Sequence, residues 1–366
     1  MKILHLCSYY FNSNMYTSLF SELEKVNVNN DVVIPIKKGQ KEKKKYNNSI
    51  YLNCYTNIDR LFFSLKENKI LKAVLKELKN KKYNYVHAHS LFTNGWLAMK
   101  LKEKYGYNYI VAVRNTDINV FFKYFFWLRK IGIKILKNSN KIIFISNTAK
   151  SEVFKKYIPK DLEKKLLEKS QVIPNGINEF WLNNLYLDKK LSSDQEKNIF
   201  FMGTLDENKN ILYLINESIK LYKAGYKFNL IIAGKGKYQK NVEEYQEKYS
   251  FINYVGYITD KERLKKLYRK ADYFVLPSKY ETFGLVYAEA LSQGCKIIYT
   301  EGQGFDGWFE EKDIGYRTNI KNLYEILEKA LRDNTILSKI IILSLKEKFN
   351  WKNIAKNYCD IYFGKK

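Results

Sequence analysis

Apolar residues along this chain fall into short runs that alternate with longer stretches in which they recur every third or fourth position. The short runs, among them residues 109–113, 228–233 and 273–276, are rich in Ile, Val, Phe and Tyr and predict buried strands. The longer stretches, such as residues 212–225, predict helices with one apolar face. Strands that alternate with helices indicate an α/β fold built on parallel sheets.

The predicted elements form two series separated by a polar stretch. In the first series we expect strands at residues 2–7, 31–36, 109–113 and 141–146, and helices at residues 15–25 and within 58–82. In the second series we expect strands at residues 198–202, 228–233, 254–257, 273–276 and 296–299, and helices at residues 212–225 and 285–291. The polar stretch between the two series, residues 179–196, predicts an interdomain linker.

Residues 271–300 carry the most informative local pattern. Pro277 ends a buried strand, a polar loop follows, and Gly284 opens a helix. A glycine at a helix start allows an anion to approach the unpaired N–H groups of the first turn, which favours a phosphate. Glu281 and Glu289 flank this point and can accept hydrogen bonds from hydroxyl groups. The pattern suits a nucleotide sugar, although Glu281 could simply complement the helix dipole and Glu289 could be a solvated helical residue.

Composition narrows the class of protein. The chain has 366 residues, 46% of them hydrophobic, which is enough for two domains with their own cores. Its four cysteines show no paired or metal-type spacing and indicate a reducing compartment. We find no secretory signal and no run of about 18 apolar residues that would span a membrane. We therefore expect a cytoplasmic protein.

The formal net charge of +26 is unevenly distributed. Residues 1–180 hold 33 Lys and Arg against 14 Asp and Glu. An excess of this kind suggests an anionic partner, although the chain is rich in Lys throughout. The aromatic and basic stretch that begins at Phe121 and ends at Lys137 is typical of an interfacial helix on an anionic membrane, and equally of a core-facing helix with snorkelling lysines.

The run Glu281-Thr-Phe-Gly-Leu-Val-Tyr-Ala-Glu289 resembles the E-x7-E motif of retaining GT-B glycosyltransferases, specifically family 4. The resemblance covers essentially the whole chain and is strongest in residues 172–300. It implies two Rossmann-like domains that face each other across a cleft. We expect an acceptor-binding domain at residues 1–178, a linker at 179–196, a nucleotide-sugar-binding domain at 197–348, and a helix at 349–366 that returns to the first domain.

The same resemblance implies the donor site. Gly203-Thr204-Leu-Asp-Glu-Asn-Lys209 is similar to the family's G-R-L-x-x-x-K, with Thr204 in place of the arginine. Lys209 and the backbone around Phe283, Gly284, Leu285 and Val286 would hold the diphosphate. Glu281 would bind the donor sugar, Glu289 the ribose and Tyr257 the base. Taken by itself, Lys209 could also be an ordinary surface lysine at the start of a helix.

On the acceptor side, the family resemblance is less complete. His89 and Ser90, in a tract similar to the family's D-V-V-H-A-H, would line the acceptor cleft, and His87 would be structural. Asn14 belongs to a first loop that is glycine-rich in many members. Arg114 stands where the family's H-G-x-D corner has its histidine, with Asp117 retained. Both are expected catalytic residues beside Glu281 and Lys209, although Arg114 and Asp117 could instead form a structural pair.

The resemblance thus implies a retaining, hexosyltransferase-type enzyme that moves a sugar from a nucleotide-diphospho-sugar, with UDP as the expected nucleotide, to a saccharide or lipid-linked acceptor in surface polysaccharide biosynthesis. The chain contains no Asp-x-Asp motif, so we expect no metal, and we expect no cofactor beyond the nucleotide sugar as co-substrate. The alternatives are a nucleotide-sugar epimerase or hydrolase of the same fold, and a non-enzymatic basic protein on membranes or nucleic acid. We expect no nucleic-acid partner and leave peripheral membrane association open.

Overall fold

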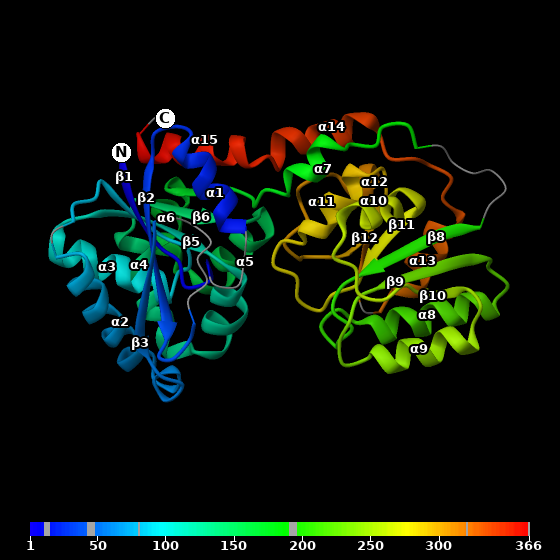
Figure 1. The fold of residues 1–366 in the computed structure, drawn as a ribbon, viewed down its shortest axis with the longest axis horizontal. Coiled ribbons are helices and arrows are strands. Elements are labelled where there is room, and N and C mark those ends of the chain that lie inside the picture. Colours follow the sequence, from blue (N-terminus) through cyan, green and yellow to red (C-terminus); the bar gives the residue numbers. More distant parts are fainter. Residues whose placement is uncertain (11–14, 42–47, 80, 190–195, 320, 365–366) are drawn as a thin grey trace. The chain divides into compact units, whose positions relative to one another are not determined.

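We describe a computed structural model of the chain, covering residues 1–10, 15–41, 48–79, 81–189, 196–319 and 321–364. The chain divides into two compact units, each with its own parallel sheet (Figure 1). Unit 1 consists of residues 1–175 and 351–366, and unit 2 of residues 176–350. The predicted α/β architecture with two parallel sheets is confirmed.

In unit 1, seven described strands pair in the order β3-β2-β1-β4-β5-β6-β7, all parallel. The strands are β1 (Lys2–Leu6), β2 (Asn29–Lys37), β3 (Ser49–Tyr55), β4 (Tyr85–Ala88), β5 (Asn108–Val113), β6 (Lys141–Phe144) and β7 (Ser170–Val172). The helices are α1 (Met15–Glu24), α2 (Phe63–Glu77), α3 (Thr93–Tyr105), α4 (Arg129–Asn138), α5 (Asn147–Tyr157), α6 (Lys160–Glu168) and α15 (Trp351–Tyr362), with short helical turns η2 (Ile58–Leu61), η3 (Asp117–Phe122) and η4 (Phe126–Leu128).

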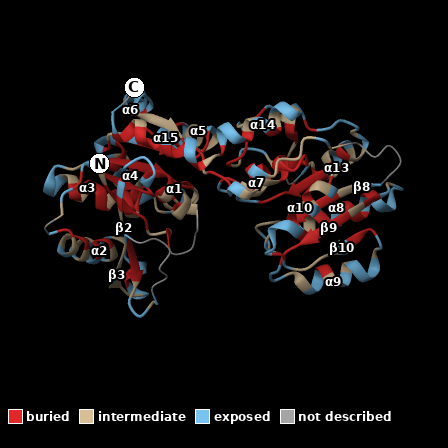
Figure 2. Cartoon of the chain, turned by 45° about the horizontal axis from the view of Figure 1, so that its top comes forward, coloured by how far each residue is buried: buried red, intermediate tan, exposed pale blue. Residues whose placement is uncertain are grey.

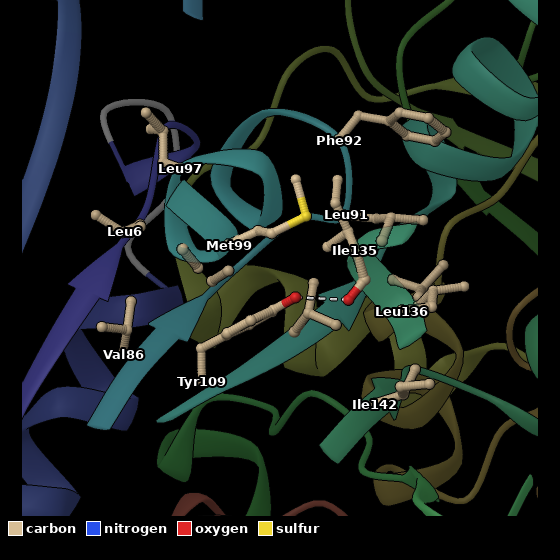
Figure 3. Close-up of a cluster of buried hydrophobic side chains, with 14 of the residues drawn as sticks. Leu6, Val86, Leu91, Phe92, Leu97, Met99, Tyr109, Ile135, Leu136 and Ile142 are labelled. Carbon is tan, nitrogen blue, oxygen red and sulfur yellow. Dashed lines mark hydrogen bonds between the residues drawn. The ribbon is translucent and has the colours of Figure 1, made fainter. Parts of the chain in front are cut away.

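Each face of the unit 1 sheet has its own core, because successive strand residues point to opposite faces. Leu4 and Leu6 belong to the core under α2, α3 and α4, whereas Ile3 belongs to the core under α1 and α15. Figure 3 shows the first core, where the buried Tyr109 hydroxyl donates to the Ile135 carbonyl oxygen at 2.6 Å. The second core explains the return of the chain, since α15 packs beside α1 (Figure 1).

In unit 2, six described strands pair in the order β10-β9-β8-β11-β12-β13, again all parallel. The strands are β8 (Lys197–Met202), β9 (Phe228–Ala233), β10 (Ile252–Tyr254), β11 (Tyr273–Leu276), β12 (Lys296–Thr300) and β13 (Gly315–Thr318). The helices are α7 (Glu179–Asn183), α8 (Ile211–Lys223), α9 (Gln239–Lys248), α10 (Lys261–Lys270), α11 (Leu285–Ser292), α12 (Glu311–Ile314), α13 (Leu323–Arg332) and α14 (Lys339–Lys348).

Burial follows the amphipathic pattern from which the helices were predicted. Figure 2 shows most of the strands buried and the outward sides of helices such as α2 and α9 exposed, whereas β3 and β7 are half-buried. In α10, for example, Leu264 and Tyr268 are buried while the lysines around them are exposed or half-buried. Over the described residues, no helix combines the length and apolar character that crossing a bilayer requires.

Four sequence expectations need correction. Part of the expected linker at residues 179–196 is helix α7, because Trp181 and Leu182 are apolar anchors buried in unit 2. The stretch from Phe121 to Lys137 is not one helix, since η3 and η4 interrupt it before α4 begins at Arg129. The strand expected at residues 254–257 is β10, which ends at Tyr254. Strands β3 and β13 were missed, because β3 is only partly buried and β13 includes the polar residues Arg317 and Thr318, so neither shows a strong apolar pattern.

The core of unit 1 yields a test of the packing. Leu97 in α3 is fully buried, so Leu97→Ala leaves a cavity and should lower the free energy of unfolding by about 2–5 kcal/mol. Chemical denaturation followed by circular dichroism measures this change. Leu167→Ala, at a 37% exposed position in α6, is the matched control and should change stability by less than about 0.5 kcal/mol. Equal effects of the two substitutions would contradict the described core.

Candidate active site

The strand order of unit 2 reverses between β8 and β11, which pair side by side although they are distant in sequence. In open parallel sheets, ligands bind at the carboxyl ends of the strands beside such a reversal. The loops at this point are residues 203–210 after β8 and residues 277–284 after β11. These loops carry most of the residues expected to bind the donor, including Gly203 and the exposed Thr204.

Lys209 and Glu281 meet at this point. The Lys209 Nζ lies 2.5 Å from Glu281 Oε2, and the two side chains are 20% and 14% exposed. Asp206 holds the backbone of Lys209 in place. Its Oδ1 accepts the Lys209 backbone N–H at 2.8 Å, and its Oδ2 accepts the Thr204 hydroxyl at 2.7 Å. The structure therefore holds a cation and a carboxylate together at the carboxyl edge of the sheet.

Two amides that the sequence did not single out connect the loops. Asn208 donates from Nδ2 to the Tyr280 carbonyl oxygen at 3.2 Å, and its Oδ1 accepts the Tyr280 N–H at 3.1 Å. Gln303 accepts the Glu281 N–H at 2.8 Å and donates to the Lys279 carbonyl oxygen at 3.2 Å. Gln303 lies in a Gly-rich loop 22 residues beyond Glu281, and this loop was the available sequence signal for a functional residue. The sequence did not reveal that Gln303 bonds to Glu281.

Gly284 precedes α11 with a positive φ of 76°, a conformation that favours glycine. A Cβ at this position would lie 2.3 Å from the Tyr287 ring, so a larger residue would displace either the helix start or the ring. The glycine thus leaves the first turn of α11, with Leu285 and Val286, open to an anion. Phe283, by contrast, is buried among aromatic rings that include Phe305 and cannot offer its side chain to a ligand.

Glu289 and Tyr257 lie in very different environments. Burial raises the pKa of Glu289 to about 7, against the opposing effect of a hydrogen bond from Trp181 of α7. Tyr257 follows β10, is 57% exposed, and has the Lys235 ammonium 4.0 Å from its ring centroid. A flat, exposed ring beside a cation suits stacking with a base, whereas Glu289 is a carboxyl group already held by the protein.

In unit 1, Arg114 and Asp117 form a buried structural corner. Asp117 accepts backbone N–H groups of Leu91, Phe92 and Arg114 at 2.9, 3.1 and 2.8 Å. Burial nevertheless raises the Asp117 pKa to about 6. The Arg114 Nε donates to the His89 carbonyl oxygen at 3.3 Å, and only 8% of the residue is exposed. Asp117 therefore positions the loops after β4 and β5 through these backbone contacts.

The predicted acceptor-side residues are less accessible than expected. His89 and Ser90 are buried, and the Ser90 hydroxyl, in the loop after β4, forms a 2.9 Å hydrogen bond with the hydroxyl of Thr93 at the start of α3. Asn14 lies outside the described residues. The structure thus brings His89 and Ser90 together with Arg114, but as buried neighbours.

His5, which the sequence analysis did not link to His87 and His89, completes a buried trio. His5 on β1 lies opposite His87 on β4, and only the pairing of these two strands reveals this. His5 Nε2 lies 2.8 Å from Asn30 Oδ1, so Nε2 carries the hydrogen and His5 Nδ1 accepts from His89 Nε2 at 3.0 Å. Burial lowers the pKa of all three imidazoles, which keeps the trio neutral.

The trio is also the group of described residues whose nitrogen atoms could hold a metal ion, all within 4.8 Å of one another. Among the described atoms, His87 Nε2 and His89 Nδ1 have no hydrogen-bond partner. Both nitrogens of His5 are engaged, however, and Arg114 places a positive charge nearby. A cation would have to break the His5–His89 bond and face that charge, so the contacts favour a neutral polar network.

Two family models of known proteins together match most of the chain. Residues 16–179 match Glycosyltransferase Family 4, and residues 184–348 match Glycosyl transferases group 1. The chain is a family 4 glycosyltransferase. It is 29% identical over 306 residues to an uncharacterized glycosyltransferase of Methanocaldococcus jannaschii, covering 77% of this chain and 75% of that protein. It is 25% identical over 235 residues to the putative glycosyltransferase EpsF of Bacillus subtilis, covering 61% and 59% of the two chains.

Solved structures show the GT-B fold of this glycosyltransferase. The sucrose-phosphate synthase of Thermosynechococcus elongatus has a TM-score of 0.77 at 18% identity and covers 100% of this chain and 98% of its own. The lipopolysaccharide outer core galactosyltransferase WaaB, in its apo form, has a TM-score of 0.78 at 16% identity with 100% of both chains covered. The predicted family and fold are therefore confirmed.

The Asp117 corner of the glycosyltransferase predicts a stability effect. In Asp117→Asn one oxygen becomes an N–H₂ group, which cannot accept, so at least one of three buried N–H groups loses its partner. We expect the free energy of unfolding to fall by about 1–3 kcal/mol, measured by urea denaturation. Glu168→Gln, at an exposed carboxylate of α6, is the control and should change stability by less than about 0.5 kcal/mol. Unchanged stability of Asp117→Asn would contradict the structural role.

Glu289 predicts a pH effect. Its pKa in the folded protein, about 7, lies above the ordinary value of 4.5, so the folded state binds more protons than the unfolded chain between these values. Stability therefore falls as pH rises through this window. Glu289→Gln removes this contribution, and its urea midpoint should fall less than that of the wild type between pH 5 and pH 8. Glu244→Gln, at an exposed position of α9, should keep the wild-type slope. If the urea midpoint of Glu289→Gln fell with pH as steeply as that of the wild type, the raised pKa of Glu289 would be refuted.

Proposed function

We propose that this glycosyltransferase is a retaining enzyme that takes a sugar from a nucleotide-diphospho-sugar, with UDP as the nucleotide. The observation that carries the proposal is the meeting of Lys209 and Glu281 at the β8/β11 reversal, beside the positive-φ Gly284 at the start of α11. This arrangement supplies what such a donor requires, namely a cation and free N–H groups for the diphosphate and a carboxylate for sugar hydroxyls.

The diphosphate is where charge develops as the glycosidic bond breaks. A fixed lysine and oriented N–H groups stabilise that charge without rearrangement during the reaction. Lys209 would serve this purpose with the N–H groups of Gly284, Leu285 and Val286, and its bond to Asp206 through the backbone keeps it at the loop. We propose no metal in this step, because these groups supply the positive charge.

Donor binding would first turn Lys209 from Glu281 to the diphosphate, before the glycosidic bond breaks, and Glu281 would then accept hydroxyl groups of the donor sugar. Gln303 holds the Glu281 backbone and limits movement of the loop. Glu289 would hold the ribose, and the exposed Tyr257 ring would lie against the base. In support, HepE of Anabaena, with a TM-score of 0.67 at 13% identity and 100% of both chains covered, was solved with UDP-glucose.

For the acceptor we propose a saccharide or lipid-linked saccharide in surface polysaccharide synthesis. WaaB, a structural neighbour named as a lipopolysaccharide outer core galactosyltransferase, supports this proposal. An epimerase or hydrolase of the same fold would turn over the donor without any acceptor. Donor turnover measured with and without a saccharide acceptor therefore separates the reactions.

The donor site is tested with Lys209→Ala. Loss of one charge-stabilising group should lower donor turnover by on the order of 10²–10³-fold. It should also weaken the thermal stabilisation that UDP-glucose and related nucleotide sugars give by binding the folded state. Assays contain EDTA, so that a requirement for a divalent metal would appear as inactivity of the wild type.

Lys223→Ala is the matched control, since Lys223 is an exposed lysine of α8 in the same unit. It should retain wild-type turnover and stabilisation. Wild-type turnover of Lys209→Ala with every accepted donor would refute the proposed site.

A further inference from the structure

The loops after β8 and β9 continue the parallel pairing of these two neighbouring strands of unit 2 (Figure 1). Met202 of β8 pairs with Ala233 of β9. Beyond both strands, the Leu205 backbone N–H still donates to the Lys235 carbonyl oxygen at 3.1 Å. Two residues after the last strand pair, Thr204 therefore lies beside Lys235, at the strand spacing of about 4.8 Å.

Two glycines bring the backbone of these loops close together. A Cβ on Gly234 would lie 1.9 Å from the Gly203 carbonyl oxygen, so no larger residue fits there without movement. A Cβ on Gly203 would lie 3.4 Å from Cγ of Lys209, so the stem of this lysine passes next to Gly203. Lys235, which follows Gly234, and Lys209 therefore start from neighbouring points at the carboxyl edge of the sheet.

The ammonium group of Lys235 is held by an aromatic ring. Its Nζ lies 4.0 Å from the centroid of the Tyr257 ring. Among the described residues, no carboxylate lies within ion-pair distance of Lys235, whereas Lys237 of the same loop pairs with Glu207. A contact with the face of a ring orients a cation without neutralising it, so the charge of Lys235 is available to an anion.

The strand order β10-β9-β8-β11 sets the order of the chemical groups along this edge. Tyr257 follows β10, Lys235 follows β9, Lys209 follows β8 and Glu281 follows β11. They give an aromatic ring, two successive cations and a carboxylate. A nucleotide-diphospho-sugar has a base, two successive phosphates and a sugar, and each of these groups is complementary to the group at the same place along the edge.

We propose that Lys235 binds the phosphate next to the nucleoside of the donor, and that Lys209 binds the phosphate that carries the sugar. This division of the diphosphate between two lysines rests on the proposed function, which supplies the ligand. It predicts that Lys235 contributes to the affinity for every nucleotide that has the first phosphate, including one that lacks the second.

Uridine, UMP and UDP separate the two lysines when each is titrated into the full chain by calorimetry. Lys235→Gln should weaken UMP and UDP binding about tenfold, because a charge-assisted hydrogen bond is lost, and leave uridine binding unchanged. Lys209→Ala should weaken UDP binding about tenfold and UMP binding much less. Wild-type affinity of Lys235→Gln for UMP would overturn the proposal, and an equal effect of Lys209→Ala on UMP and UDP would overturn the division.

Lys235 is exposed, so Lys235→Gln should fold, and an unchanged thermal midpoint without ligand checks this. Lys240→Gln, at an exposed lysine of α9, is the charge-matched control and should bind all three ligands like the wild type. Lys279→Gln tests the exposed lysine in the loop after β11. A loss of UMP affinity in Lys279→Gln and not in Lys235→Gln would assign the phosphate to the wrong loop and overturn the proposal.

The neighbouring position 204 allows a rescue experiment. Thr204→Arg in the Lys235→Gln background places a cation beside position 235 again and should recover most of the UMP affinity. Thr204→Gln in the same background should recover none, and both substitutions remove the hydrogen bond from the Thr204 hydroxyl to Asp206. A purely structural role of Lys235 predicts no difference between the two double variants, and that result would overturn the proposal.

Donor turnover on the same preparations separates this inference from the proposed function. Wild-type turnover together with unchanged UMP binding by Lys235→Gln would overturn the inference alone. Weakened UMP binding by Lys235→Gln, without turnover of any nucleotide sugar by the wild type, would support the phosphate site and overturn the proposed transfer. A wild type that binds neither UMP nor UDP would overturn both.

Discussion

Parallel pairing of every described strand is the constraint on which the rest of this structure depends. Strands covered by helices on both faces leave little room for polar groups within the sheet, so most of the polar chemistry collects in the loops at the carboxyl ends. In unit 2 these loops bring Lys209 to Glu281 and Lys235 to the Tyr257 ring. In unit 1 they bring Asp117 to the backbone of Leu91 and Phe92. Each unit thus concentrates its polar contacts at this edge of its sheet.

Polar groups that do enter the interior are held by specific hydrogen bonds. Asp117 accepts three backbone N–H groups, and the chain from Asn30 through His5 to His89 has a defined direction of donation. A buried polar group left without a hydrogen-bond partner lowers the free energy of unfolding by about 1–3 kcal/mol, and these hydrogen bonds avoid that loss. These networks bind the first strands of unit 1 to its loops, and His87 Nδ1 makes a separate hydrogen bond with the Tyr362 hydroxyl of α15 at 2.7 Å. The returning helix is therefore held by polar contacts as well as by its apolar face.

Sequence reasoning reached furthest where a predicted site depends on residues close together in the chain. Gly284, Glu281 and Glu289 lie within one strand–loop–helix unit, and their local order was enough to predict a phosphate and hydroxyl site. It failed where neighbours come from distant strands. Gln303 reaches Glu281 only because β12 pairs with β11, and His5 meets His89 only because β1 pairs with β4. No periodicity within either segment contains that information.

By itself, the sequence determined the α/β class, the two series of elements and the family, because each depends on local periodicity or on a short ordered pattern. Only the tertiary structure decided that residues 179–183 are a helix of unit 2, that Asp117 is a buried structural acceptor, and that Lys235 lies against the Tyr257 ring. The physical reason is that burial and side-chain contact are properties of packed elements, and strand order sets which elements pack together.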